Sequence, residues 1–338
     1  MRRIIFTILC IFTIVLTCYS QKVTLQHNGK IVGFFSNSDG TCLTEAFEHA
    51  EEGDTLFLSQ GDYYLPIIDK AITIIGVGAS ECAIRENFAL RETIKIQAKP
   101  NSTISQINLE GISLDEVTVA RNYSSEDIGE IENINIKKSI LKRGFWADNY
   151  GVVIGNITFD SSKLSGNTSV YIHKNLIFRN CDISYISFSG SETTLPKYLN
   201  CDIVNYKGNK ALCINCIIGQ VGEGVTEYLE TGHILINTLY HKIENYDPAK
   251  KCIQQDCYAT EEAITSNVDE WGSNNKLIIT EEQLRQNNYL GTDGTIIGKS
   301  GGARPFNLDM HIPIVTKNNF SIDQNNKKAS INVSVTAK

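Results

Sequence analysis

Apolar and polar residues alternate in short runs from residue 53 onward, and the runs end at turn residues. Gly53 precedes the alternating run Asp54–Leu58, and the run Ala71–Ile75 ends at Gly76. A period of two residues places successive side chains on opposite faces of a β-strand. The pattern therefore predicts a series of short, half-buried strands.

One sequence phrase recurs further along the chain. It consists of an apolar residue, a polar residue, a turn residue that is usually Asn, a small residue, and a return to apolar residues. The clearest copies are Phe178–Ile183, Leu199–Ile203 and Ile214–Ile218, with looser copies at 136–140, 159–162, 236–239 and 255–258. Successive copies begin about 15 to 24 residues apart, which is the length of one coil of a solenoid. Such a coil cannot bury its own apolar face, so the coils must stack.

Stacking places the same turn position of neighbouring coils about 4.8 Å apart. At this spacing an Asn amide is able to bond the Asn above and below it, so the turn is predicted to carry a ladder. The ladder residues are Asn180, Asn200, Asn215 and Asn237. The small residue that follows each Asn suits a turn with little space, and we expect it to point inward. These inward residues are Cys181, Cys201 and Cys216.

The two ends of the repeat region have patterns of their own. Upstream, a short helix capped by Thr44 and ended by Gly53 is predicted, with Ala46 and Phe47 on its apolar face. Such a helix would plug the open end of a stack. Downstream, alternation on both sides of a polar turn at residues 324–328 predicts a β-hairpin. We interpret this hairpin as a cap, with a secretion or anchoring tail as the alternative.

The ends of the repeat region also resemble a known group of proteins. The segment Ala46–Gly78 has the order Gly-Asp-Thr, Gly-x-Tyr, Lys-x-Ile-Thr-Ile-x-Gly, and the segment Gly291–Phe306 is rich in glycine. They resemble the first and closing coils of secreted bacterial right-handed parallel β-helix proteins of the pectate-lyase-like superfold. The resemblance implies an all-β, single-stranded right-handed parallel β-helix with a short N-terminal capping helix and a C-terminal β-hairpin cap. Because that superfold includes enzymes and surface proteins without known activity, it leaves the function open.

The first 20 residues have the pattern of an export signal. Arg2 and Arg3 precede an apolar stretch over residues 4–16, and Ser20 provides a small residue for cleavage. The stretch is shorter than the roughly 20 residues that span a bilayer, so we expect no transmembrane span. The chain is thus divided into a signal peptide (1–20), a β-helix with its N-terminal cap (21–311) and the hairpin (312–338). We expect a secreted or outer-surface protein, soluble or, as the alternative, lipid-anchored through Cys18.

Charge limits the choice of partners. The 338 residues carry a formal net charge of −7, and their Lys and Arg residues are spread evenly. Nucleic-acid binding requires a basic stripe to neutralise phosphates, and this sequence has none. We therefore expect no nucleic-acid partner, and we expect a monomer that contacts polysaccharide if it has a partner.

Two aspartates are the best candidates for chemistry. A β-helix polysaccharide lyase needs a base and a cation that neutralises the uronate carboxylate. Asp182 and Asp202 occupy matching positions on neighbouring coils, so their carboxylates are predicted to lie about 5 Å apart. With Arg179 and Lys197 they form the candidate catalytic group. Calcium is the alternative occupant, but Ile217 takes the matching position of the next copy and calcium prefers six to eight oxygens. We expect no metal and no cofactor, and favour a solvated or lysine-paired acid pair.

The cysteines allow three interpretations. Two of the ten cysteines lie in the signal segment, and Cys213-x-x-Cys216 with Cys252 and Cys257 has a superficial zinc spacing. Alternation predicts that Cys213 and Cys216 lie on opposite faces of one strand, which argues against zinc. We favour an inward line of reduced or locally paired thiols, with disulfides as the alternative.

An aromatic segment offers a second candidate site. Sugar rings stack on aromatic side chains while Asp and Asn bind hydroxyls. The candidate ligand-binding residues are Phe145, Trp146, Asp148, Asn149 and Tyr150. The alternative is that Phe145 and Trp146 cover the interior of a coil.

These observations favour an extracellular or cell-surface β-helix without catalytic activity, structural or glycan-contacting. No convergent set of acid, base and cation stands out in the sequence. A polysaccharide lyase or other carbohydrate-active enzyme is the first alternative. A surface adhesin, supported by the hairpin and Cys18, is the second.

Overall fold

The computed structural model describes most of the chain from residue 21 onward. The described residues are 21–65, 67–85, 93–119, 129–147, 152–170, 174–188, 195–208, 210–221, 233–241, 253–260, 262, 264–266, 276–310, 313–323 and 328–337. The predicted signal peptide lies outside this range. The chain divides into two compact units, Met1–Leu308 and Asp309–Lys338, which are described separately.

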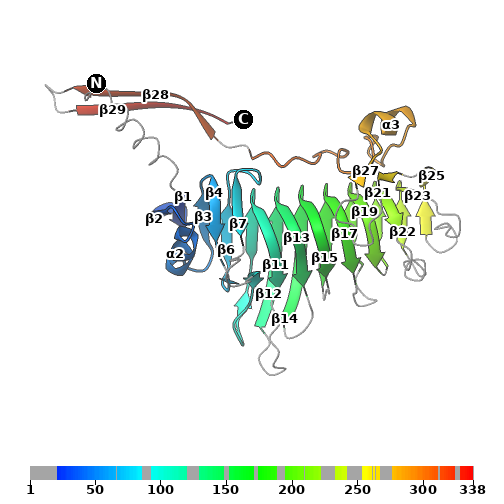
Figure 1. The fold of residues 1–338 in the computed structure, drawn as a ribbon, viewed down its shortest axis with the longest axis horizontal. Coiled ribbons are helices and arrows are strands. Elements are labelled where there is room, and N and C mark those ends of the chain that lie inside the picture. Colours follow the sequence, from blue (N-terminus) through cyan, green and yellow to red (C-terminus); the bar gives the residue numbers. More distant parts are fainter. Residues whose placement is uncertain are drawn as a thin grey trace, which may run out of the picture. The chain divides into compact units, whose positions relative to one another are not determined.

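The first unit is a parallel β-helix built on two long sheets (Figure 1). Its sheet A contains ten mutually parallel strands: β3 (Asp54–Leu58), β6 (Ile72–Ile75), β10 (Ile107–Glu110), β12 (Gly129–Lys137), β14 (Val152–Asp160), β16 (Asn175–Arg179), β18 (Lys197–Leu199), β20 (Leu212–Ile214), β22 (Ile234–Ile236) and β24 (Ile253–Gln255). Each coil then turns into sheet B: β4 (Gly61–Tyr64), β7 (Cys82–Arg85), β11 (Ser113–Val119), β13 (Ile140–Ala147), β15 (Lys163–Val170), β17 (Asp182–Phe188), β19 (Asp202–Gly208), β21 (Ile217–Val221), β23 (Leu239–His241) and β25 (Tyr258–Thr260). Short strands β5 (Ile67–Ile68), β8 (Ile94–Ile96) and β9 (Thr103–Ile104) complete early coils. The predicted parallel β-helix is confirmed.

The N-terminal end of the stack is built from two antiparallel strands and a helix. β1 (Gln21–His27) pairs antiparallel with both β2 (Lys30–Asn37) and β3. Helix α2 (Cys42–His49) buries Leu43, Ala46 and Phe47, so the predicted capping helix is present. Its predicted boundaries are wrong: the N-cap is Thr41, while the Thr44 hydroxyl donates to the carbonyl of Tyr64.

Seven successive coils, from the coil of β12 to that of β24, turn from sheet A to sheet B through one non-glycine residue in the left-handed conformation. This turn row has φ between 44° and 56° and consists of Lys138, Ser161, Asn180, Asn200, Asn215, Asn237 and Asp256. Asn and Asp enter this conformation more readily than most residues because their short polar side chains bond locally. The recurrent Asn of the sequence phrase is therefore explained by backbone geometry.

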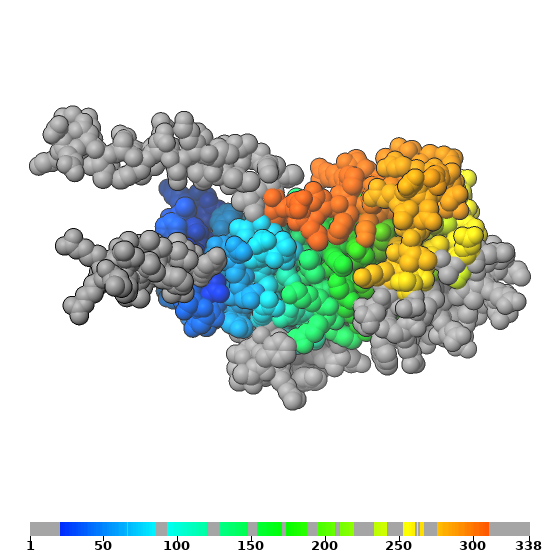
Figure 2. Space-filling model, turned by 45° about the horizontal axis from the view of Figure 1, so that its top comes forward, coloured from blue at the N-terminus to red at the C-terminus, as the bar shows by residue number. Residues whose placement is uncertain are grey.

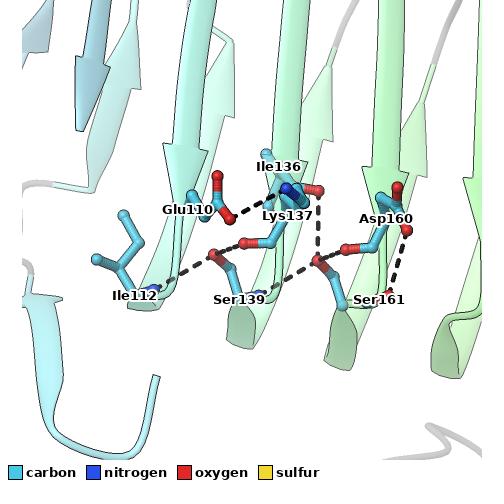
Figure 3. Close-up of polar contacts among 8 residues, drawn as sticks. Glu110, Ile112, Ile136, Lys137, Ser139, Asp160 and Ser161 are labelled. Atoms are coloured by element: carbon cyan, nitrogen blue, oxygen red, sulfur yellow. Dashed lines mark hydrogen bonds and ion pairs between the residues drawn. The ribbon is translucent and has the colours of Figure 1, made fainter. Parts of the chain in front are cut away.

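The residue after the turn row points into the β-helix. This inner row consists of Ser139, Ser162, Cys181, Cys201, Cys216, Thr238 and Cys257. In Figure 3, the Ser139 hydroxyl donates to the carbonyl of Lys137 at 2.8 Å and accepts the amide of Ile112 at 3.4 Å. The Cys201 thiol likewise faces the carbonyl of Leu199 at 3.3 Å. Small side chains with a polar hydrogen thus satisfy a carbonyl inside the bend, and the predicted inward cysteine line is confirmed.

Asparagine ladders are present, but on sheet A rather than in the turn row. The Asn175 amide donates to Asn156, and the Asn156 amide donates to Asn133, both at 2.8 Å. The ladder predicted for the turn row is wrong, because Asn180 and Asn215 instead bond a segment from the end of the unit.

The interior contains a column of aromatic rings. Phe159 stacks on Phe178, and Phe178 on Tyr198, with ring centroids 4.8 and 4.9 Å apart. Phe145 meets Phe159 edge-to-face at 5.2 Å. All four side chains are fully buried, so the coils are held in register by ring packing as well as by backbone hydrogen bonds.

The chain after the last coil adds outer layers and the second unit. Strands β26 (Thr265–Ser266) and β27 (Lys276–Leu277) pair antiparallel, and helix α3 (Glu281–Gln286) starts with a Thr280–Gln283 capping box. In the second unit, β28 (Pro313–Asp323) and β29 (Lys328–Ala337) form the predicted hairpin. Among the described residues, no helix has the length and apolarity needed to cross a membrane.

Candidate functional site

The outer surface of sheet B carries a row of side chains that changes from apolar to charged along the stack. This outer row consists of the first residues of successive strands: Tyr258, Leu239, Ile217, Asp202, Asp182 and Lys163. Ile217 and Leu239 pack outside the interior core, in a cluster with Leu284 of α3. The predicted alignment of Asp182 with Asp202 is confirmed, because they are direct Cα partners.

A glycine-rich segment, Gly291–Gly302, lies over these coils; we call it the closing segment. In Figure 2 the orange end of the unit lies over the green coils. Its Thr292 amide donates to the Asn215 side chain at 3.0 Å, and its Gly301 carbonyl accepts from the Asn180 amide at 3.0 Å. The turn row therefore serves as the attachment line for the closing segment.

Lys299 of the closing segment lies between the two aspartates. Its Nζ is 2.7 Å from Asp182 Oδ2 and 3.5 Å from Asp202 Oδ2. Its backbone amide donates to Asp202 Oδ1 at 3.0 Å. The Lys299 side chain retains 27% exposure and that of Asp202 only 12%. Both oxygens of Asp202 are thus engaged by one residue.

Lys299, Asp182 and Asp202 form a triad, which we call the Lys299 triad. Burial and charge have opposite effects on the pKa values of Asp202 and Lys299. Burial raises the pKa of Asp202 to about 6, although the charge and backbone amide of Lys299 pull it down. Burial alone would lower the pKa of Lys299, but the charges of Asp182 and Asp202 outweigh it and raise that pKa. The triad therefore holds a charged lysine beside a carboxyl group that titrates near neutral pH.

The triad forms one wall of a groove with a volume of about 440 Å³. Lys163, Ser165 and Ser184 continue its lining on β15 and β17, and Lys276 of β27 also lines it. Within the described part of the chain, these two lysines and two serine hydroxyls have no hydrogen-bond or ion-pair partner. The groove thus offers free cationic and hydroxyl groups beside an acid pair that is already engaged by Lys299.

The other two candidate catalytic residues lie elsewhere. Arg179 and Lys197 belong to sheet A, where both are exposed and Arg179 pairs in register with Leu199. The cation beside the aspartates is Lys299, which is 117 residues beyond Asp182 and was missed in the sequence. Its signal was the flanking Gly298, Gly301 and Gly302, which allow a backbone to approach a neighbour closely.

The aromatic candidate site is only partly described. Phe145 is fully buried against Phe159, so its ring is not available to a sugar; the alternative, that it covers the interior, applies to this residue. Trp146 is half-buried on β13. Asp148, Asn149 and Tyr150 lie outside the described residues.

The expectation that Cys213 and Cys216 lie on opposite faces is wrong. Both are buried, because Asn215 between them adopts the left-handed turn and returns the chain to the interior. The described cysteines are free thiols, and burial raises the pKa of Cys201 and Cys216 well above the usual range. Among the described residues, no three His, Cys, Asp or Glu side chains are grouped for metal binding. Cys252 lies outside them.

Comparison of the chain with protein-family models, curated proteins and solved structures finds no match.

Proposed function

We propose that this chain is an exported extracellular β-helix protein that contacts a polysaccharide in the groove on sheet B without cleaving it. The engagement of both acids by Lys299 is the observation that carries the proposal. A general base must have a free lone pair directed at the substrate proton. Asp202 accepts the Lys299 backbone amide through Oδ1 and forms an ion pair with the Lys299 ammonium through Oδ2, so the acid pair fastens the closing segment instead.

The free groups of the groove support binding. Serine hydroxyls exchange hydrogen bonds with sugar hydroxyls, and lysines bind carboxylate or sulfate substituents. Lys163 and Ser165 lie on β15 and Ser184 lies on β17, and these two parallel strands are about 4.8 Å apart. A linear glycan chain laid along the stack would meet these groups in succession.

Affinity electrophoresis in gels containing neutral or acidic polysaccharides tests the binding. We expect the mature protein to be retarded by at least one polysaccharide, and the Lys163→Ala/Ser184→Ala double variant to lose most of that retardation. The control is Lys99→Ala, because Lys99 is 68% exposed and, among the described residues, its side chain pairs with Asp69 alone. Free migration in every gel, or equal retardation of the double variant, would contradict the proposal.

The lyase alternative rests on a different observation. Asp202 titrates near neutral pH beside a lysine, which is the pairing of base and cation that β-elimination requires. Incubation with pectate, alginate and chondroitin, with and without calcium, followed by unsaturated-uronate absorbance, decides between the two. We expect no product. Product that disappears in Asp202→Asn would establish the lyase.

A further inference from the structure

The Lys299 triad differs from the other lysine–carboxylate pairs of the described residues. These pairs have nitrogen–oxygen distances of 3.0 to 3.9 Å, and their lysines are 42% to 68% exposed; they are Lys99–Asp69, Lys137–Glu110, Lys142–Asp115 and Lys174–Glu130. Lys299 approaches Asp182 to 2.7 Å with only 27% exposure, and has a second carboxylate beside it. The amine and the carboxyl group are therefore held together on the wall of the groove, and the lysine is less exposed to water than in the other pairs.

Lys299 is also fixed through its backbone on both sides. Its amide donates to Asp202 Oδ1, and its carbonyl accepts the Phe306 amide at 2.7 Å and the Asn180 side chain at 3.4 Å. The Phe306 ring lies 5.4 Å from Nζ. Groups held in this way react as if at concentrations of about 10⁵ M or more, which offsets the unfavourable condensation of amines with carboxylates in water.

We propose that Lys299 and Asp182 form an intramolecular isopeptide bond, with Asp202 as the proton-transfer group. Asp202 takes a proton from the Lys299 ammonium, and the neutral Nζ attacks Cγ of Asp182. The tetrahedral intermediate passes a second proton from its nitrogen to one of the former carboxylate oxygens of Asp182. The C–O bond to that oxygen then breaks while Asp202 returns its proton to it, so that the oxygen leaves as water. The products are one amide and one water, and Asp202 ends as it began.

The charges of Asp182 and Asp202 raise the pKa of Lys299 and so favour its ammonium form, but two features of Asp202 suit the proton transfer. Asp202 exchanges protons near neutral pH because burial raises its pKa to about 6. It lies 3.5 Å from the attacking nitrogen, within reach once the side chains relax. The bond would join the closing segment covalently to β17, across the attachment that otherwise depends on an ion pair and turn-row hydrogen bonds.

Intact-mass spectrometry of the full mature chain tests the bond. We expect a mass one water below that of the sequence, and a digest containing a branched peptide that joins Lys299 to Asp182. Asp202→Asn should slow the loss of water by about a hundredfold or more, because a proton-transfer group contributes at least that factor. Asp202→Glu should restore part of the rate.

Two controls keep the result unambiguous. Lys299→Arg retains the positive charge and, with unchanged circular dichroism, should have the full mass; Lys137 and Glu110 should stay unjoined in the same digest. Succinimide formation at Asp39-Gly40 also removes water, so a loss that persists in Lys299→Arg would count against the bond. A full mass in the folded wild-type protein after prolonged incubation would overturn the proposal.

Discussion

The left-handed turn residue determines which neighbouring positions face inward. Because φ is positive at Asn180, Asn200 and Asn215, the following residue turns into the bend and its side chain must be small. The same position is Ser in two earlier coils and Cys or Thr in later ones, and all three types donate to the carbonyl two residues before. At this scale the sequence phrase records backbone geometry rather than a ligand site.

Substitution of Cys201 tests the inner row. Cys201→Ser should cost no more than about 1.5 kcal/mol, because Ser139 and Ser162 already make the same contact in other coils. Cys201→Asp should cost about 3 kcal/mol or more, since it leaves a buried charge without a partner. Denaturant unfolding measures both. Equal stability of Cys201→Asp and wild type would show that the row is open to solvent.

A second residue-scale prediction concerns Tyr198. Among the described residues its buried hydroxyl has no hydrogen-bond partner, whereas the Tyr63 hydroxyl bonds the carbonyl of Lys22 at 3.1 Å. Tyr198→Phe should therefore leave the free energy of unfolding unchanged or raise it by up to about 1 kcal/mol, while Tyr63→Phe should lower it by about 1 kcal/mol. Denaturant titration of the two variants in parallel checks the contrast. A loss for Tyr198→Phe as large as that for Tyr63→Phe would mean that an internal partner exists.

The closing segment depends on glycines whose roles differ. Gly294 and Gly298 both have positive φ, +75° and +84°. A Cβ added at Gly294 meets no atom within 4 Å, but one added at Gly298 would overlap Oδ1 of Asp202. The element can therefore be fastened to sheet B only with glycine next to Lys299.

Alanine substitutions at Gly294 and Gly298 distinguish the backbone strain of a positive φ from the steric overlap of an added Cβ with Asp202. Gly294→Ala should cost about 1 kcal/mol, the penalty for a left-handed alanine. Gly298→Ala should cost more and should release the closing segment, so that limited proteolysis cleaves within it. Comparable stability and protease resistance of the two variants would show that the close approach to Asp202 has no role in attachment.

Elements were predictable from the sequence where local rules decide them. Alternation located the strands, and the turn pattern located the hairpin β28–β29. The ladder and Lys299 were not predictable in the same way. Asn180 bonds Gly301, which is 121 residues away in the sequence. The repeat within the coils contains no information about which later segment packs on their outer surface. Similarly, alternation failed at Cys213 and Cys216 because it assumes one continuous strand.

At the scale of the whole β-helix, each coil contacts only its neighbours, so stability is distributed along one dimension. The middle coils have long strands, such as the nine-residue β12 and the eight-residue β13. Ile134 of β12 and Leu141 of β13 are fully buried. The last coil has three-residue strands, and Ile253 on β24 is 64% exposed. The first coil is also terminal, but β1 pairs with its strand β3 and α2 packs against β3 and β4.

Hydrogen exchange followed by mass spectrometry should reveal this gradient. Amides of β12–β15 should exchange only through global unfolding, and those of β24 and β25 at least about a hundredfold faster through local opening. Amides of β3, which lies under the N-terminal cap, should exchange as slowly as those of the middle coils. This comparison shows whether fast exchange is caused by the absence of a covering element or simply by a position at the end of the stack. If β3 exchanged as fast as β24, the cap would contribute no stability. Uniform protection from β3 to β25 would instead mean that the whole stack unfolds as one cooperative unit.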